Sequence, residues 1–143
     1  MNAISPTAPT PTSTAKTLFS AKTHSKSGRD GYAKSEDGFL NLSLSQPHPA
    51  AENLFAAAWS ACYMGAIELA AQQRKVKLAG NPEVIAQIDL NRACDSFFLK
   101  AHFDVTVPGV DRATAEALTE IAHTICPYSK AVHGNIEVTT AVL

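Results

Sequence analysis

Apolar and polar residues alternate along several stretches of this chain, which is the pattern of a strand with one buried face. The stretches with this alternation are 39–44, 84–90, 97–107 and 136–142. Two shorter segments, 18–24 and 32–35, are predicted as strands that precede them. Glycine-rich turns separate the first three strands, and Asp37-Gly38 is a strong hairpin signal. We expect an N-terminal three-stranded meander, and later an antiparallel hairpin with its turn at 91–96.

Two longer stretches space their apolar residues by three and four positions, as a helix with one buried face does. The first runs from Ala50 or Ala51 to about Arg74, and its predicted buried stripe is Phe55, Ala58, Trp59, Cys62, Ala66, Leu69 and Ala70. The second follows Asp111, a predicted N-cap, and ends at Ile125. Its predicted stripe is Leu118, Ile121 and Ile125. A short helix is predicted at 128–132, after Pro127. The order predicts an α+β fold, with antiparallel sheets packed on two main helices.

Composition sets the number of domains. The chain has 143 residues, of which 45% are hydrophobic, and this suits one domain with a single core. We place that domain at residues 17–143. Residues 1–16 are rich in proline, threonine and serine, and they are predicted to form a disordered tail.

Charge and cysteine content exclude several classes of partner. The formal net charge of −1 gives no electrostatic footprint for nucleic acid. Residues 50–71 form the longest apolar run, but Glu52 and Glu68 interrupt it, so no membrane span is predicted. The odd count of three cysteines favours a reducing, cytoplasmic location over a disulfide-stapled secreted domain. The cysteine and histidine spacings match no usual metal site, and we expect no bound metal or cofactor.

Two of the three cysteines are candidates for chemistry. Cys62 lies within the first helix, where a buried cysteine often serves only as a small hydrophobic residue. Cys126 precedes Pro127, which places its sulfur at the start of a short helix, where free N–H groups lower a thiol pKa. Cys94 falls in a turn and is interpreted as incidental. We interpret Cys62 and Cys126 as a working redox pair.

A reactive thiolate also needs a positive partner. Arg29 is the best candidate because it lies in a tight turn between Gly28 and Gly31, although a turn arginine is usually only solvated. Glu52 is in the first turn of the long helix. It could hold the guanidinium through a bidentate contact, or it could simply complement the helix dipole. Periodicity does not decide whether Arg29 reaches Cys62.

Three separated motifs together resemble one known family. They are Gly28-Arg29-Asp30-Gly31, Glu52-Asn53-Leu54-Phe55 with Ser60-Ala61-Cys62, and Cys126-Pro127-Tyr128-Ser129 followed by Gly134-Asn135-Ile136. The combination resembles the organic hydroperoxide resistance proteins, the Ohr branch of the OsmC/Ohr superfamily. The resemblance covers about residues 17–143, which leaves only the tail outside it.

The resemblance implies an intertwined α+β homodimer with two active sites at its interface. It also implies a thiol peroxidase that reduces alkyl and lipid hydroperoxides to alcohols and takes electrons from a dihydrolipoyl group, such as that of a lipoylated protein. By the same resemblance, Cys62 is the peroxidatic cysteine and Cys126 the resolving cysteine, which form a disulfide. Arg29 would polarise the thiolate and the peroxide, and Glu52 would fix Arg29.

The sequence departs from the family pattern just before the long helix. Members usually carry a glycine-rich loop followed by Asn-Pro-Glu, whereas here the link is Ser45 to Ala51, with Ala50-Ala51 in place of Asn-Pro. Asn53 also replaces the usual glutamine. Two alternatives stay open. One is an OsmC-type peroxidase of broader specificity, and the other is a non-enzymatic redox sensor or apolar-ligand binder on the same scaffold.

Overall fold

The chain divides into two compact units, Met1–Pro49 and Ala50–Leu143. The structure, a computed structural model, describes residues 15–45 and 51–143. The predicted tail lies outside the described residues except for Ala15 and Lys16, and so does the link at 46–50. One domain over residues 17–143 stays a prediction.

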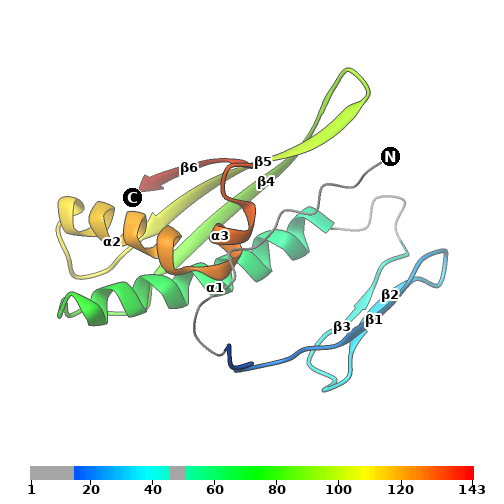
Figure 1. The fold of residues 1–143 in the computed structure, drawn as a ribbon, viewed down its shortest axis with the longest axis horizontal. Coiled ribbons are helices and arrows are strands. Elements are labelled where there is room, and N and C mark those ends of the chain that lie inside the picture. Colours follow the sequence, from blue (N-terminus) through cyan, green and yellow to red (C-terminus); the bar gives the residue numbers. More distant parts are fainter. Residues whose placement is uncertain (1–14, 46–50) are drawn as a thin grey trace. The chain divides into compact units, whose positions relative to one another are not determined.

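The N-terminal unit is a three-stranded antiparallel sheet (Figure 1). Its strands are β1 (Thr23–Lys26), β2 (Tyr32–Ser35) and β3 (Asn41–Ser43), in the order β1-β2-β3. The predicted meander is therefore confirmed, but the first strand was placed too early. β2 ends at Ser35, opposite Thr23, so the ladder leaves no β2 residue to pair with the earlier apolar residues. Leu18 and Phe19 are accordingly 88% and 80% exposed.

The turn that carries Arg29 depends on its two glycines. Gly28 has a φ of +105°, in the region that only glycine adopts freely, and its carbonyl accepts the Gly31 N–H at 2.9 Å. A Cβ atom on Gly31 would lie 2.9 Å from the carbonyl oxygens of Gly28 and Lys26. Neither glycine can therefore take a side chain without strain, which explains why the turn has this sequence.

The C-terminal unit has a mixed sheet in the order β4-β5-β6. Its strands are β4 (Glu83–Ala93), β5 (Ser96–Thr106) and β6 (Glu137–Val142). The predicted antiparallel hairpin of β4 and β5 is confirmed, but its turn contains only Cys94 and Asp95, because Cys94 adopts a φ of +53°. β6 pairs with β5 in parallel, so this sheet is not wholly antiparallel as predicted. Parallel pairing follows from the helical crossover between these two strands.

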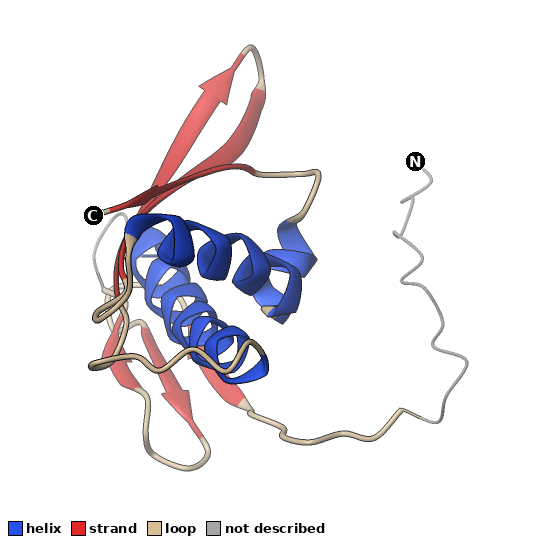
Figure 2. Cartoon of the chain, turned by 90° about the vertical axis from the view of Figure 1, so that its left-hand side faces the viewer, coloured by secondary structure: helices blue, strands red, loops and turns tan. Residues whose placement is uncertain are grey.

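Two of the three helices in the described residues, α1 (Ala51–Gln73) and α2 (Arg112–Ile125), cover one face of this mixed sheet, and the short α3 (Pro127–Val132) packs against both (Figures 1 and 2). The predicted N-cap of α2 is confirmed, since Asp111 Oδ1 accepts the Thr114 N–H at 2.9 Å. The predicted position of Pro127 at the start of α3 is confirmed as well.

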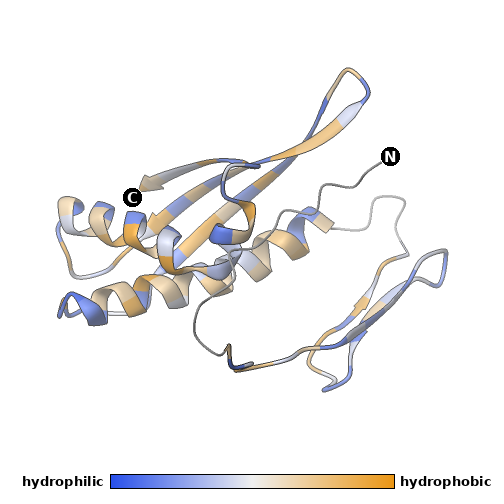
Figure 3. Ribbon diagram, viewed as in Figure 1, coloured by the Kyte–Doolittle hydropathy of each residue, from blue (hydrophilic) through white to orange (hydrophobic). Residues whose placement is uncertain are grey.

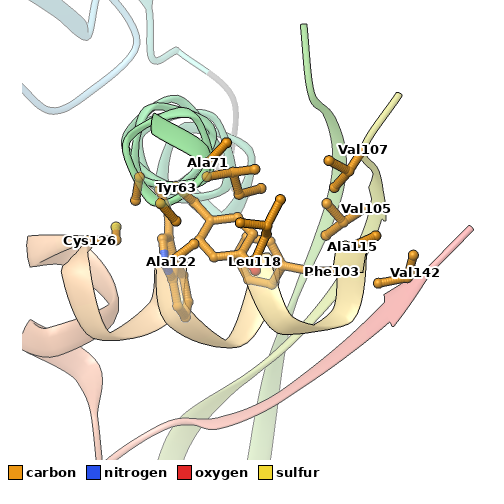
Figure 4. Close-up of a cluster of buried hydrophobic side chains, with 14 of the residues drawn as sticks. Tyr63, Ala71, Phe103, Val105, Val107, Ala115, Leu118, Ala122, Cys126 and Val142 are labelled. Carbon is orange, nitrogen blue, oxygen red and sulfur yellow. The ribbon is translucent and has the colours of Figure 1, made fainter. Parts of the chain in front are cut away.

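The core lies between α1, α2 and the inner face of the sheet (Figure 4). Apart from Val105 and Cys126, its largest fully buried side chains are Trp59, Tyr63, Ile67, Phe103 and Leu118. The predicted stripe of α1 was wrong in two places, because Ala58 is exposed and Leu69 is 40% exposed. The alanine-rich sequence of α1 offers apolar residues on several sides, so spacing alone did not fix its buried face. The Tyr63 hydroxyl can be buried without an unpaired polar group, since it donates to the Thr119 carbonyl at 2.9 Å.

α1 is long and apolar enough by composition to cross a bilayer, since an 18-residue window within it has a mean hydropathy of 1.4 (Figure 3). Glu52 and Glu68, the two charged residues of α1, interrupt this apolar sequence as predicted. A core helix passes the same test of length and composition. Trp59, Tyr63 and Ile67 of α1 are fully buried in the protein core, which explains the apolar composition.

Candidate redox site

Two thiols that are 64 residues apart in the sequence meet in the C-terminal unit. Cys62 lies in the middle of α1, and Cys126 lies where α2 ends and α3 begins. Their Sγ atoms are 2.9 Å apart, and both thiols are free. Cys126 is fully buried and Cys62 is half-buried. The structure thus brings together the two cysteines predicted as a redox pair, with the more accessible sulfur on α1.

The first turn of α3 directs backbone amides at both sulfurs. The Ser129 N–H donates to Cys126 Sγ at 3.5 Å, and the Tyr128 backbone N–H acts on Cys62 in the direction that lowers its pKa. First-turn amides lack acceptors within their own helix, so the sulfurs satisfy them. Pro127 occupies the first position, where the missing N–H costs nothing. The sequence Cys-Pro-Tyr-Ser therefore builds this part of the site locally.

The surroundings of Cys62 disfavour its thiolate. Burial raises the pKa of Cys62 above its usual value, and the neighbouring Cys126 thiol raises that pKa further. The Tyr128 N–H acts in the opposite direction, but it does not outweigh burial. A thiol in this state is a weak nucleophile at neutral pH. Within the C-terminal unit, burial is therefore the dominant influence on the pKa of Cys62.

The two predicted charged residues belong to different units. Arg29 lies in the exposed β1–β2 turn of the N-terminal unit, and Glu52 lies half-buried in the first turn of α1. The roles assigned to them stay predictions. Phe55 and Trp59, predicted to line a pocket or its supporting core, contact each other edge to face with ring centroids 5.6 Å apart.

A polar network that was not predicted from the sequence lies next to Cys126, with Trp59 and Ser129 buried and His123 half-buried. Ser129 Oγ accepts the Trp59 indole N–H at 2.8 Å and is 2.9 Å from His123 Nδ1. His123 Nε2 is 3.0 Å from Thr140 Oγ1, and its ring stacks on Tyr63 with centroids 4.3 Å apart. Burial lowers the pKa of His123 below its usual value. The one sequence signal was the position of His123, three residues and so one helical turn before Cys126.

A cavity of about 350 Å³ adjoins this network. Its lining residues are Trp59, His123, Ser129, His133, Gly134, Ile136, Val138 and Thr140. Among the residues that the structure describes, no group of three or more histidine, cysteine, aspartate and glutamate side chains could hold a metal ion. The chemistry that the C-terminal unit offers is therefore that of two adjacent thiols beside a neutral hydrogen-bond network.

Comparison with known proteins connects this site to a family. The sequence model of the family described as OsmC-like protein matches residues 44–141. The organic hydroperoxide resistance protein of Xanthomonas axonopodis pv. citri (strain 306) is 35% identical over 87% of this chain and 94% of its own length. Both the match and the identity extend over nearly all of the C-terminal unit.

Solved structures show the same fold. A crystal structure of an organic hydroperoxide resistance protein OsmC from Legionella pneumophila aligns with a TM-score of 0.81 and 30% identity, over 89% of this chain and 98% of that one. The crystal structure of OhrB of Bacillus subtilis aligns with a TM-score of 0.79 and 32% identity, over 89% of this chain and 100% of that one. The predicted α+β fold of the OsmC/Ohr type is confirmed by these likenesses.

Proposed function

This chain belongs to the OsmC-like protein family, and we propose that it is a thiol peroxidase that reduces organic hydroperoxides to alcohols. The observation that carries the proposal is the 2.9 Å separation of the Cys62 and Cys126 sulfurs. Several relatives bear the name organic hydroperoxide resistance protein, which supports the choice of substrate. Cys62 is the attacking residue in this proposal because its sulfur is the more accessible of the two.

In the first step, the Cys62 thiolate attacks one oxygen of the hydroperoxide and the O–O bond breaks. Cys62 becomes a sulfenic acid, and the leaving alkoxide takes a proton to become the alcohol. Arg29 is proposed to favour the thiolate and to stabilise the charge on the leaving oxygen. Glu52 is proposed to hold the guanidinium in place. The raised pKa of Cys62 supports the need for such a cation.

In the second step, Cys126 attacks the sulfenic sulfur, a water molecule leaves, and a Cys62–Cys126 disulfide forms. The disulfide prevents further oxidation of Cys62. A dithiol then reduces it by exchange and becomes a disulfide itself. We propose a dihydrolipoyl group, free or on a lipoylated protein, as this dithiol. The net reaction consumes one hydroperoxide and one dithiol and yields one alcohol, one water and the oxidised donor.

The apolar surroundings of Cys62 support a preference for alkyl and lipid peroxides. Each CH₂ group that a substrate buries against apolar side chains contributes about 0.8 kcal/mol, which hydrogen peroxide cannot gain. We further propose a cytoplasmic homodimer. In support, the β4–β5 hairpin exposes large apolar residues, with Ile85 67%, Phe97 66% and Leu90 47% exposed. A second copy of the chain would cover such a surface.

The direct test of this function is multiple turnover with defined substrates and donors. With dihydrolipoamide as donor, the purified protein should reduce cumene hydroperoxide over many cycles. It should be much slower with hydrogen peroxide, and glutathione, a monothiol, should support little turnover.

Two other outcomes would favour the alternatives. Comparable rates with cumene hydroperoxide and hydrogen peroxide would indicate an OsmC-type peroxidase of broader specificity. A single stoichiometric oxidation without turnover, with every dithiol tried, would contradict the enzyme and indicate a redox sensor on the same scaffold.

A further inference from the structure

We propose that His123 is a positioning residue that acts through Ser129 to keep Cys126 against Cys62 while the disulfide forms. The inference rests on the proposed thiol peroxidase function and deepens it. It assigns to the buried network a role in the second chemical step, in which Cys126 must reach the sulfenic acid before another peroxide does.

One arrangement of protons satisfies the whole network. The Trp59 indole N–H can only donate, so Ser129 Oγ accepts it at 2.8 Å. The hydroxyl proton of Ser129 is then free to go to His123 Nδ1 at 2.9 Å. His123 is therefore protonated on Nε2, which donates to Thr140 Oγ1 at 3.0 Å. In this arrangement His123 accepts from Ser129 and holds its side chain in a fixed direction.

The network reaches the sulfurs through the backbone of Ser129. The same residue donates its N–H to Cys126 Sγ, and the preceding amide, of Tyr128, lowers the pKa of Cys62. α3 has six residues, and a helix this short has little stability of its own. Its first turn is instead anchored at the buried Ser129 side chain by Trp59 of α1 and His123 of α2. If this anchor is lost, the first turn of α3 can shift, and its two backbone amides no longer keep the Cys62 and Cys126 sulfurs next to each other.

The hydrogen bond from the Ser129 hydroxyl to His123 Nδ1 requires a neutral imidazole. The rings of Tyr63 and Phe103 pack against His123 from α1 and β5. The charged or titratable residues that line cavities together with His123 are Arg112, Glu116, Glu120, Lys130 and His133. Within residues 15–45 and 51–143, no ion pair joins any of these residues to His123. A proton on Nδ1 would leave the buried Ser129 hydroxyl without its acceptor.

Burial supports this neutral state, because it lowers the pKa of His123. The neutral imidazole is therefore the dominant form at pH 7, and the network is complete there. As the pH falls through the lowered pKa, Nδ1–H instead donates to Ser129 Oγ, and the Ser129 hydroxyl loses its acceptor. Acid pH should consequently slow disulfide formation, in addition to any effect on the thiols themselves.

Two substitutions at His123 separate its hydrogen bond from its packing. His123→Phe keeps a ring to stack on Tyr63 but removes the acceptor for Ser129. His123→Asn loses the ring, but its amide oxygen falls near the place of Nδ1 and can accept from Ser129. Ser129→Ala removes the same hydrogen bond from the other side and also removes the acceptor of the Trp59 indole N–H. Thr124→Ala is the matched control, since its hydroxyl bonds only to the Ile121 carbonyl one turn earlier on α2.

The experiment follows one equivalent of cumene hydroperoxide by rapid quenching, alkylation and mass spectrometry of Cys62. We expect disulfide formation about tenfold slower in His123→Phe, the loss for one hydrogen bond, and at least as slow in Ser129→Ala, with more Cys62 sulfinic acid at excess peroxide. His123→Asn and Thr124→Ala should stay near the wild-type rate. Below pH 6, the wild type should slow more steeply than His123→Asn, which does not titrate.

Other results would overturn the inference. It is wrong if His123→Phe forms the disulfide as fast as wild type, or if His123→Asn is as slow as His123→Phe, which would point to packing alone. Ser129→Ala at the wild-type rate would contradict it as well. If the wild type itself oxidises Cys62 but forms no disulfide, the proposed resolving step fails, and the role of His123 fails with it.

Discussion

Replacing Cys62 by serine should abolish peroxide turnover. The substitution exchanges sulfur for oxygen at one position and keeps the shape of the side chain. A serine hydroxyl has no appreciable anionic fraction at neutral pH and cannot form a sulfenic acid. With cumene hydroperoxide and dihydrolipoamide, we expect turnover to fall by about 10³-fold or more, as when other covalent catalytic nucleophiles are removed.

The exposed third cysteine provides the matched control for this loss. Cys94→Ser removes a thiol from the β4–β5 turn and should leave turnover unchanged. Cys126→Ser is informative in another way, because it keeps Cys62. In that variant the first turnover should occur, and Cys62 should then over-oxidise to sulfinic acid. If Cys62→Ser reduces the peroxide at a rate within tenfold of the wild-type rate, Cys62 is not the attacking residue.

Replacing Arg29 by methionine should move the titration of Cys62 to higher pH. The pKa of Cys62 is already raised by burial and by the Cys126 thiol, so any thiolate at pH 7 depends on a positive charge. Loss of a nearby opposite charge typically shifts a pKa by about 1–3 units. The thiolate fraction at neutral pH, and with it the rate of the first step, should fall by about 10- to 1,000-fold.

The measurement is the pH dependence of iodoacetamide labelling, read on the Cys62 peptide by mass spectrometry. Arg29→Met should need a higher pH for half-maximal labelling rate, and Arg29→Lys should be intermediate because it keeps the charge but not the planar fork. Arg112→Met is the control, since Arg112 is an exposed arginine that contacts Glu116 on α2. An unchanged midpoint in Arg29→Met would exclude Arg29 as the activating cation.

Local sequence signals correctly predicted the elements whose ends are marked by an N-cap residue, a proline or a glycine turn. α2 was placed correctly because Asp111 caps it and Pro127 follows it, and β2 was placed correctly because glycine turns flank it. β1 was misplaced because Leu18 and Phe19 look like strand residues but lie beyond the pairing register. The parallel pairing of β6 was missed because alternation indicates a strand but not the direction of its neighbour.

In the candidate site, too, local sequence signals predicted some residues and missed others. Cys126 drew attention because a cysteine before a proline places sulfur at a helix start, and the structure confirms that its sulfur accepts a first-turn amide. The contact with Cys62 spans 64 residues, and the bond from Trp59 to Ser129 spans 70. Only the packing of α1 on α2 and α3 creates these contacts, so no local pattern contains them. His123 was missed for the same reason.

The most direct test of the account is the state of the two cysteines after one equivalent of organic hydroperoxide. Purified, reduced protein is treated with cumene hydroperoxide, free thiols are alkylated, and peptides are mapped by mass spectrometry without reduction. The account predicts a Cys62–Cys126 disulfide in nearly all molecules, an unmodified Cys94 thiol, and recovery of both thiols with dihydrolipoamide. Cys62 recovered only as sulfinic acid or as free thiol, with no Cys62–Cys126 linkage, would contradict it.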